Sequence, residues 1–381
     1  MEWKEVRLGD FMQCNPKRTI KKGQKARKIT MDLLIPHSKT IRNWNYEPYS
    51  GGAKFQNGDT IMARITPCLE NGKHAFVSIL DEGEIAYGST EYFVFCGKEN
   101  VSDDDFVYYL TKTPLFRESA IKSMVGSSGR QRAQMDVLEN LQMLVPKDIT
   151  DQRRIASILS SLDWKIELNN KINADLEEMA QAIFKNWFVD FEPFKDGKFV
   201  KSELGMIPEG WKVGCLGDIA EITSGKRPPK KSKDKTKDLS IPLIGASDIM
   251  GFTSDVLYER PILVIGRVGT HGVVQRFQEK CWPSDNTLVI ESSYYNYVYQ
   301  LLKGIDYPAI NRGSTQPLIT QTDVKNTDVI IAPENVLKEY ESITSTLFSK
   351  HRANIKENSR LSLLRDTLLP RLMSGELEVP E

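Results

Sequence analysis

The feature that most constrains this chain is a heptad pattern along residues 150–192. Apolar side chains recur there at alternating steps of four and three residues, and no proline interrupts them before Pro193. This spacing is typical of the a and d positions of a coiled coil. At a rise of about 1.5 Å per residue, a helix of about forty residues is roughly 60 Å long, which exceeds an ordinary core helix. We therefore predict a long helix that separates other parts of the protein. Its seam runs through Ile155, Leu159, Leu162, Ile166, Asn169, Asn173, Leu176, Ala180, Ile183 and Trp187.

A second heptad stretch, residues 334–375, copies the first. A shift of 188 residues places Ile155 on Ile343. Both seams are polar in the middle, which restricts the register and the choice of partner, so we predict that the two helices pair with each other, antiparallel. Two unrelated amphipathic helices on separate domains remain the alternative. The second seam runs through Val336, Tyr340, Ile343, Leu347, Lys350, Asn354, Glu357, Leu361, Leu364 and Leu368. The predicted helix-pairing residues are Leu159, Leu162, Ile166, Asn169, Asn173, Leu347, Asn354, Leu361 and Leu364.

The rest of the chain reads as two similar domains. Residues 1–149 and 207–333 contain short apolar runs bounded by turn signals such as Asn57-Gly58-Asp59, which is typical of strand-rich mixed α/β domains. Trp211-Lys212 repeats Trp3-Lys4 at a distance of 208 residues. Residues 193–206 are predicted as a linker and 376–381 as a tail. We expect an α+β fold with an internal pseudo-twofold repeat, in the order domain, helix, domain, helix.

Charge and cysteine usage exclude several classes of protein. The 51 basic and 51 acidic side chains cancel, so any binding of nucleic acid must depend on local clusters. No apolar run approaches 18 residues, and the first residues are polar, which favours a cytoplasmic protein without a membrane partner. The five cysteines and four histidines are scattered, so neither a metal site nor a disulfide framework is predicted.

Three motifs of the chain resemble the specificity (S) subunit of type I restriction-modification systems. They are FKNWFVDFEP at 184–193, LGMIPEGW at 204–211 and LLPRLMSG at 368–375. The resemblance implies two target recognition domains, 1–149 and 207–333, that each read one half of a split, asymmetric sequence in double-stranded DNA. It implies that the helices 150–192 and 334–375 set the spacer and dock two modification (methyltransferase) subunits, onto which restriction (translocase/nuclease) subunits assemble. S-adenosylmethionine, ATP and Mg are then expected in those partners and no cofactor in this chain.

Two basic loops occupy matching places in the two domains. They could contact phosphates without reading sequence, or they could be solvated surface. The candidates are Lys17, Arg18, Lys21, Lys22, Lys226, Arg227, Lys230 and Lys231.

Two polar loops are stronger candidates for contact with bases. Gly and Ser allow close approach of the backbone, and Arg, Gln and Asn can pair bidentately with base edges. Flexible polar turns remain the alternative. The candidates are Ser127, Ser128, Arg130, Gln131 and Arg132 in the first loop and Asn311, Arg312, Ser314 and Gln316 in the second. Arg64 and Arg267, inside predicted strands, either face DNA or pair with a carboxylate.

No catalytic residue is predicted. The sequence contains neither the Asn or Asp-Pro-Pro-aromatic tetrapeptide of adenine methyltransferases nor a G-x-x-x-x-G-K-[ST] phosphate loop. We therefore expect a non-catalytic DNA-binding subunit. A coiled-coil scaffold that binds only protein and a single-chain DNA-modifying enzyme with an unrecognised site are the alternatives.

Overall fold

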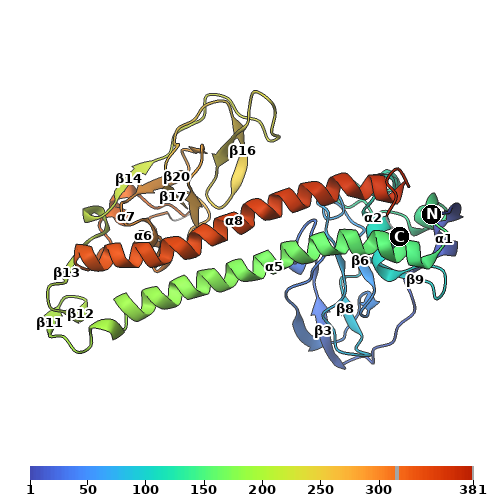
Figure 1. The fold of residues 1–381 in the computed structure, drawn as a ribbon, viewed down its shortest axis with the longest axis horizontal. Helices are drawn as coiled ribbons and strands as arrows, with labels where there is room; N and C mark the ends of the chain where they lie inside the picture. Colours follow the sequence, from blue (N-terminus) through green and yellow to red (C-terminus); the bar gives the residue numbers. More distant parts are fainter. Residues whose placement is uncertain (314–316, 380–381) are drawn as a thin grey trace. The chain divides into compact units, whose positions relative to one another are not determined.

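A computed structural model describes residues 1–313 and 317–379 of the chain, and it divides into two compact units. Unit 1 comprises Met1–Lys171 and Ala353–Glu381, and unit 2 comprises Ile172–Arg352. The long helices α5 (Ile149–Phe188) and α8 (Glu334–Met373) each contribute one segment to each unit. Every unit also contains one strand-rich domain, which can be followed in Figure 1. The predicted fold class is confirmed.

Domain 1, the strand-rich part of unit 1, contains three small sheets in the orders β1-β10, β2-β9-β6-β7 and β4-β3-β8-β5. All strand pairs are antiparallel except β3 with β8. Asp103 begins α2 by accepting a hydrogen bond from the backbone of Phe106, and α2 then buries Phe106 and Tyr109 in the core. The strands are β1 (Trp3–Arg7), β2 (Met12–Cys14), β3 (Lys25–Ile29), β4 (Asn45–Pro48), β5 (Lys54–Phe55), β6 (Thr60–Ala63), β7 (His74–Phe76), β8 (Ala86–Gly88), β9 (Tyr92–Gly97) and β10 (Gln142–Pro146). The helices are α1 (Leu8–Phe11), η1 (Met31–Leu33), α2 (Asp104–Lys112), α3 (Pro114–Lys122) and α4 (Met135–Glu139).

Domain 2, the strand-rich part of unit 2, repeats this plan. Its described residues form sheets in the orders β13-β21, β14-β20-β17-β18 and β16-β15-β19, and the parallel pair of β15 with β19 corresponds to β3 with β8. The internal repeat predicted from sequence is therefore present in the strand order, except that the third sheet has four strands in domain 1 and three in the described part of domain 2. The strands are β13 (Lys212–Cys215), β14 (Glu221–Ser224), β15 (Ile241–Ile244), β16 (Ile249–Thr253), β17 (Ile262–Gly266), β18 (Val274–Phe277), β19 (Trp282–Pro283), β20 (Thr287–Glu291) and β21 (Asp328–Ile331). The helices are η3 (Leu216–Asp218), α6 (Tyr295–Lys303) and α7 (Gln321–Lys325).

The segment predicted as a linker, 193–206, is more ordered than a linker. It contains part of the 3-10 helix η2 (Glu192–Phe194) and a hairpin of β11 (Phe199–Ser202) and β12 (Gly205–Pro208). Phe191 and Phe194 pack against Trp211, with ring centroids 5.5 and 5.0 Å apart. The aromatic motif that ends α5 is thus part of the core of unit 2.

Within unit 1, α5 and α8 run antiparallel and meet through polar side chains. Asn358 Nδ2 donates to Asn170 Oδ1 over 2.9 Å, and Asn169 Nδ2 donates to Glu357 Oε2 over 2.8 Å. Both pairs are 188 residues apart in sequence, which is the shift that superposes the two heptad stretches. Residues that the sequence repeat aligns with each other therefore contact each other across the two helices. The contact between Asn169 and Glu357 lies in the polar middle of both predicted seams.

Within unit 2, the same two helices pack through aromatic side chains. The Tyr340 ring of α8 lies 5.1 Å from Phe188 and 6.1 Å from Trp187 of α5, measured between centroids. Domain 2 joins this contact because the hydroxyl of Tyr299, on α6, donates to the carboxylate of Glu177 over 3.0 Å. The helix pair and domain 2 therefore share one core.

The structure corrects the predicted α8 seam at Ile343 and Leu364. Leu364 is 46% exposed and Ile343 is 39% exposed, whereas their neighbours Arg365 and Thr344 are buried. The prediction of Leu364 as a helix-pairing residue is therefore wrong. It favoured an apolar side chain, whereas the buried residue at this place is the charged neighbour Arg365. On α5, Leu159, Asn169 and Asn173 are buried, and so is Asp163, the neighbour of the predicted residue Leu162. Of the other predicted residues, Asn354 is buried and Leu162, Ile166, Leu347 and Leu361 are half-buried.

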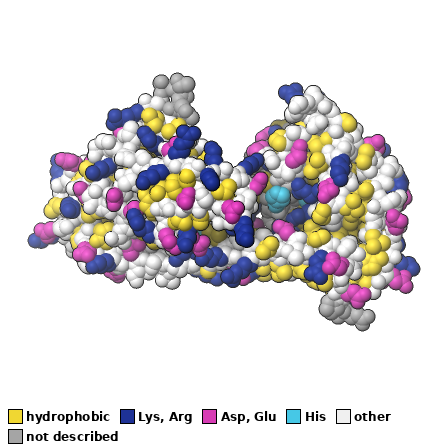
Figure 2. Space-filling model, turned by 90° about the horizontal axis from the view of Figure 1, so that it is seen from above, with side chains coloured by type: hydrophobic (Ala, Val, Ile, Leu, Met, Phe, Trp, Pro, Cys, Tyr) yellow, Lys and Arg dark blue, Asp and Glu magenta, His cyan; other side chains and the backbone are white. Residues whose placement is uncertain are grey.

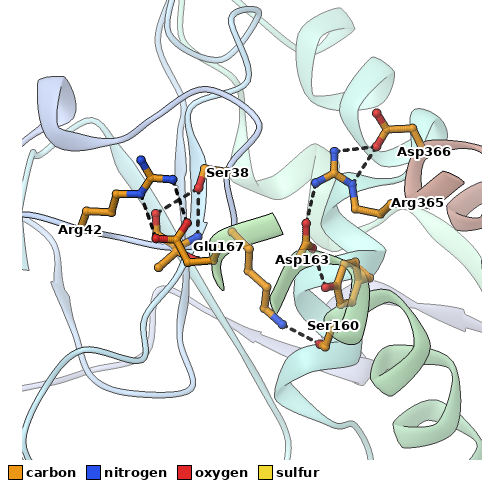
Figure 3. Close-up of polar contacts among 10 residues, drawn as sticks. Ser38, Arg42, Ser160, Asp163, Glu167, Arg365 and Asp366 are labelled. Atoms are coloured by element: carbon orange, nitrogen blue, oxygen red, sulfur yellow. Dashed lines mark hydrogen bonds and ion pairs between the residues drawn. The ribbon is translucent and has the colours of Figure 1, made fainter. Parts of the chain in front are cut away.

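A buried ion pair explains why Arg365 occupies the seam. Arg365 Nη1 lies 2.5 Å from Asp163 Oδ1 (Figure 3). Asp163 also accepts a hydrogen bond of 2.7 Å from the hydroxyl of Tyr109 in α2. A second, more exposed pair joins Arg42 of domain 1 to Glu167 of α5 over 2.8 Å. These contacts fix α5, α8 and domain 1 to one another within unit 1.

Candidate nucleic-acid interface

In domain 1, two of the candidate arginines meet at one carboxylate. Arg64 follows β6 and Arg132 ends the first polar loop, and they bind Glu91 with N–O distances of 3.1 and 2.7 Å. The hydrogen bonds from Arg132, and secondarily from Arg64, lower the pKa of the Glu91 carboxyl group. Of the two alternatives left open for Arg64, the structure has the pairing with a carboxylate.

The loop 126–132 projects from this cluster. Ser127, Ser128 and Arg130 are exposed, whereas the carbonyl of Gln131 accepts a hydrogen bond of 3.0 Å from the backbone of Thr66. The loop is thus attached at Gln131 and Arg132 and exposes the residues before them. Side chains that could reach a base are Arg130 and the two serines.

A cleft of about 610 Å³ lies beside Arg64. Lys17, Arg18 and Lys54 also line it, so its walls are basic. Arg18 Nε donates to Asp59 Oδ2 over 2.9 Å, and the Asp59 side chain is 1% exposed, so Arg18 is held by the protein and is less available to DNA than predicted. Lys54 is absent from the candidates taken from the sequence. The signal that could have indicated it is the preceding Gly51-Gly52 pair, in which both glycines adopt positive φ.

The basic segment after Pro16 is partly structured. Lys17, Lys21 and Lys22 are exposed, and the strand β3 begins soon after them, at Lys25. Lys28 pairs with Glu47 over 2.7 Å. The available positive charge is therefore concentrated before β3.

In domain 2, the corresponding basic loop is exposed at all four candidate positions. These are Lys226, Arg227, Lys230 and Lys231. The loop is attached at its start, where the backbone of Lys226 donates to the carbonyl of Pro283 over 3.0 Å. Each of these residues could meet a phosphate, and their role remains a prediction.

The second polar loop is described only in part. Asn311 accepts hydrogen bonds from the backbones of Gly313 and Leu318, at 3.0 and 2.9 Å, so its side chain shapes the loop. Arg312 is exposed and pairs with Asp323 of α7. Ser314 and Gln316 lie outside the described residues.

Arg267 is the counterpart of Arg64. The backbone of Arg267 donates to the carbonyl of Asn286 over 2.8 Å, as that of Arg64 donates to Glu91 over 3.0 Å. The guanidinium of Arg267 makes no hydrogen bond or ion pair with the described residues, and its Nε is buried. The two arginines thus share a place in the fold and differ in their partners.

The surface charge is mixed. Figure 2 shows Lys and Arg side chains interleaved with Asp and Glu on the face that it presents. Within residues 1–313 and 317–379, no cluster of His, Cys, Asp or Glu side chains is arranged to hold a metal ion. In the same part of the chain, no helix is both long and apolar enough to span a membrane.

Comparisons with known proteins agree with the resemblance. The model of the type I restriction modification DNA specificity domain matches residues 1–178 and 208–360. The chain is 32% identical to the MjaIX specificity subunit of Methanocaldococcus jannaschii, covering 90% of this chain and 86% of that protein. It is 24% identical to the HindI specificity subunit of Haemophilus influenzae, covering 99% and 100%.

A solved structure shares the fold. The S subunit of a type I restriction-modification system from M. genitalium superposes with a TM-score of 0.57 at 15% identity, covering 98% of this chain and 96% of that one. At this identity the likeness concerns the fold alone. With the match of the family model to most of the sequence, it leads to one conclusion: the chain belongs to the family of type I restriction-modification DNA specificity subunits.

Proposed function

We propose that this chain reads a bipartite, asymmetric target in double-stranded DNA, one half-site per domain. Membership of its family makes it a subunit for DNA sequence recognition. The finer statement depends on one observation, which is that two domains of closely similar strand order carry different side chains at matching positions. Glu91 of domain 1 corresponds to Asn286 of domain 2. Domains that place different hydrogen-bonding groups on DNA read different bases, so the two half-sites differ.

The helix pair is proposed to determine the length of the spacer between the half-sites. The helices α5 and α8 each contribute one segment to each unit, so both recognition modules are attached to the same helix pair. The separation of the two half-sites then depends on helix length, and the bases recognised in each half-site depend on the domains. The two properties should vary independently.

The chemistry is proposed to belong to partners. Two methyltransferase subunits would bind the helices, supply S-adenosylmethionine and modify adenines, and restriction subunits would supply ATP hydrolysis, Mg and cleavage. This chain would act in the cytoplasm as the non-catalytic subunit that selects the address. The relatives MjaIX and HindI are named as specificity subunits, which supports this division of labour.

The test is to co-express the chain with the methyltransferase subunit of its own operon and to map methylated adenines by single-molecule sequencing. A split, asymmetric motif with an unspecified spacer is expected. A stable complex that methylates nothing would favour a protein scaffold. Methylation by the purified chain alone would show that it is an enzyme.

A further inference from the structure

The two domains differ at one pair of positions in a way that bears on how each reads DNA. Arg64 and Arg267 occupy the same backbone position, directly after β6 and β17, and each donates its backbone N–H to the carbonyl of the residue before β9 or β20. That residue is Glu91 in domain 1 and Asn286 in domain 2. The arginine of domain 1 therefore lies beside a carboxylate, and the corresponding arginine of domain 2 lies beside a neutral amide.

This exchange changes what the arginine can do. In domain 1, Glu91 accepts from both Arg64 and Arg132, so one carboxylate holds both guanidinium groups and offsets one of their two positive charges. In domain 2, no described carboxylate pairs with Arg267, and its half-buried guanidinium has a buried Nε without an acceptor. Burying a charged group without partners is costly, and such a group gains most from a ligand that supplies acceptors.

A second unpaired polar atom lies in the same turn. His271 contacts the carbonyl of Gly266 through Nδ1 at 3.1 Å, and its buried Nε2 has no hydrogen-bond partner. Asn286 itself is exposed. Buried polar atoms of Arg267 and His271 without hydrogen-bond partners therefore occur at the place where domain 1 has its Glu91 ion cluster, and the residue that corresponds to Glu91 is an exposed amide.

We propose that Arg267 reads a guanine in the half-site of domain 2, and that Asn286 leaves it free to do so. The guanidinium fork matches the O6 and N7 acceptors of guanine, which is the most frequent specific contact of arginine with DNA. The counterpart Arg64 is held by Glu91 and positions the loop that ends at Arg132. This inference depends on the proposed function, because it assigns one base contact within it.

The experiment uses the full chain in complex with its methyltransferase subunit. Three variants are compared with wild type: Arg267→Ala, Arg267→Lys, which keeps the charge without the fork, and Asn286→Glu, which supplies the carboxylate that domain 1 has. Arg260→Ala is the matched control, because Arg260 is an exposed arginine of the same domain that is already paired with Glu291 over 3.0 Å. The readouts are the methylation motif and the affinity for duplexes that carry each base at each position.

All three variants are expected to lose discrimination for guanine at one position of one half-site, by about 10- to 100-fold. The other half-site and the control should keep the wild-type motif. If Arg267→Ala prevents assembly, Arg267→Lys and Asn286→Glu decide the question.

The possible failures are distinguishable. A wild-type complex without a bipartite motif would refute the proposed function. A wild-type motif that persists in all three variants would refute only the role of Arg267. Weakening that is equal for all sequences, with a salt dependence reduced by about one phosphate contact, would make Arg267 a phosphate ligand and would overturn the assignment to guanine.

Discussion

Removing the Asp163 carboxylate should destabilise unit 1 far more than removing a comparable carboxylate from its surface. The side chains of Asp163 and Arg365 are 5% and 7% exposed, so Asp163→Ala leaves a buried guanidinium without its main partner. Breaking a buried pair in this way costs about 3 to 5 kcal/mol. Arg365 keeps a hydrogen bond of 2.9 Å to Asp366, which favours the lower end of that range, and the loss of the acceptor of Tyr109 adds about 1 kcal/mol. We expect a total near 4 kcal/mol.

Hydrogen exchange of the α5 amides between residues 155 and 170 measures this loss, because it reports the local free energy of opening. A decrease of about 4 kcal/mol accelerates exchange by roughly a thousandfold. The matched control is Glu167→Ala, since the Arg42–Glu167 pair is 38% and 28% exposed and should contribute about 0 to 1 kcal/mol. The double variant Asp163→Leu with Arg365→Met should restore most of the protection, because neither charge remains. Equal effects of Asp163→Ala and Glu167→Ala, or a double variant as unstable as Asp163→Ala, would refute the reasoning.

Three further outcomes are expected. Lys112→Met should raise the free energy of unfolding at pH 7 by about 1 to 3 kcal/mol, because burial lowers the pKa of the Lys112 amine from 10.5 to about 8. The folded state releases this proton first, so the destabilisation by wild-type Lys112 is full below pH 8 and fades as the pH rises toward 10.5; urea unfolding should show the two proteins converging in that window. Adding the same whole number of turns to α5 and α8 should lengthen the spacer in the methylation motif and keep both half-sites, and a changed half-site would contradict the separate roles of helices and domains. Replacing Lys230 and Lys231 by Gln should reduce the slope of log affinity against log salt by about two without changing the motif, and an unchanged slope would exclude phosphate contacts there.

Sequence reasoning reached the architecture because the features that encode it are repeated. The heptad spacing, the shift of 188 residues and the recurrence of Trp3-Lys4 at Trp211-Lys212 are local patterns, and each is visible without knowing the fold. The segment 193–206 was harder to predict. Its proline and glycines indicate a linker, whereas its order depends on Phe194 packing against Trp211, a contact that no local pattern encodes.

The candidate site shows the same limit more sharply. The sequence places Arg64 and Arg267 at matching positions, but it does not say which of them has a carboxylate within reach, because Glu91 and Arg64 are 27 residues apart. In the seam of α8, burial likewise depends on which partner a side chain meets: Arg365 is buried and Leu364 is exposed. A rule that predicts burial from hydrophobicity selects Leu364 as the buried residue. Burial of the charged neighbour becomes favourable only because Asp163, 202 residues earlier in the chain, supplies the compensating charge. Periodicity thus predicts where helices pair, and the choice between adjacent residues at each seam position depends on contacts between residues far apart in sequence.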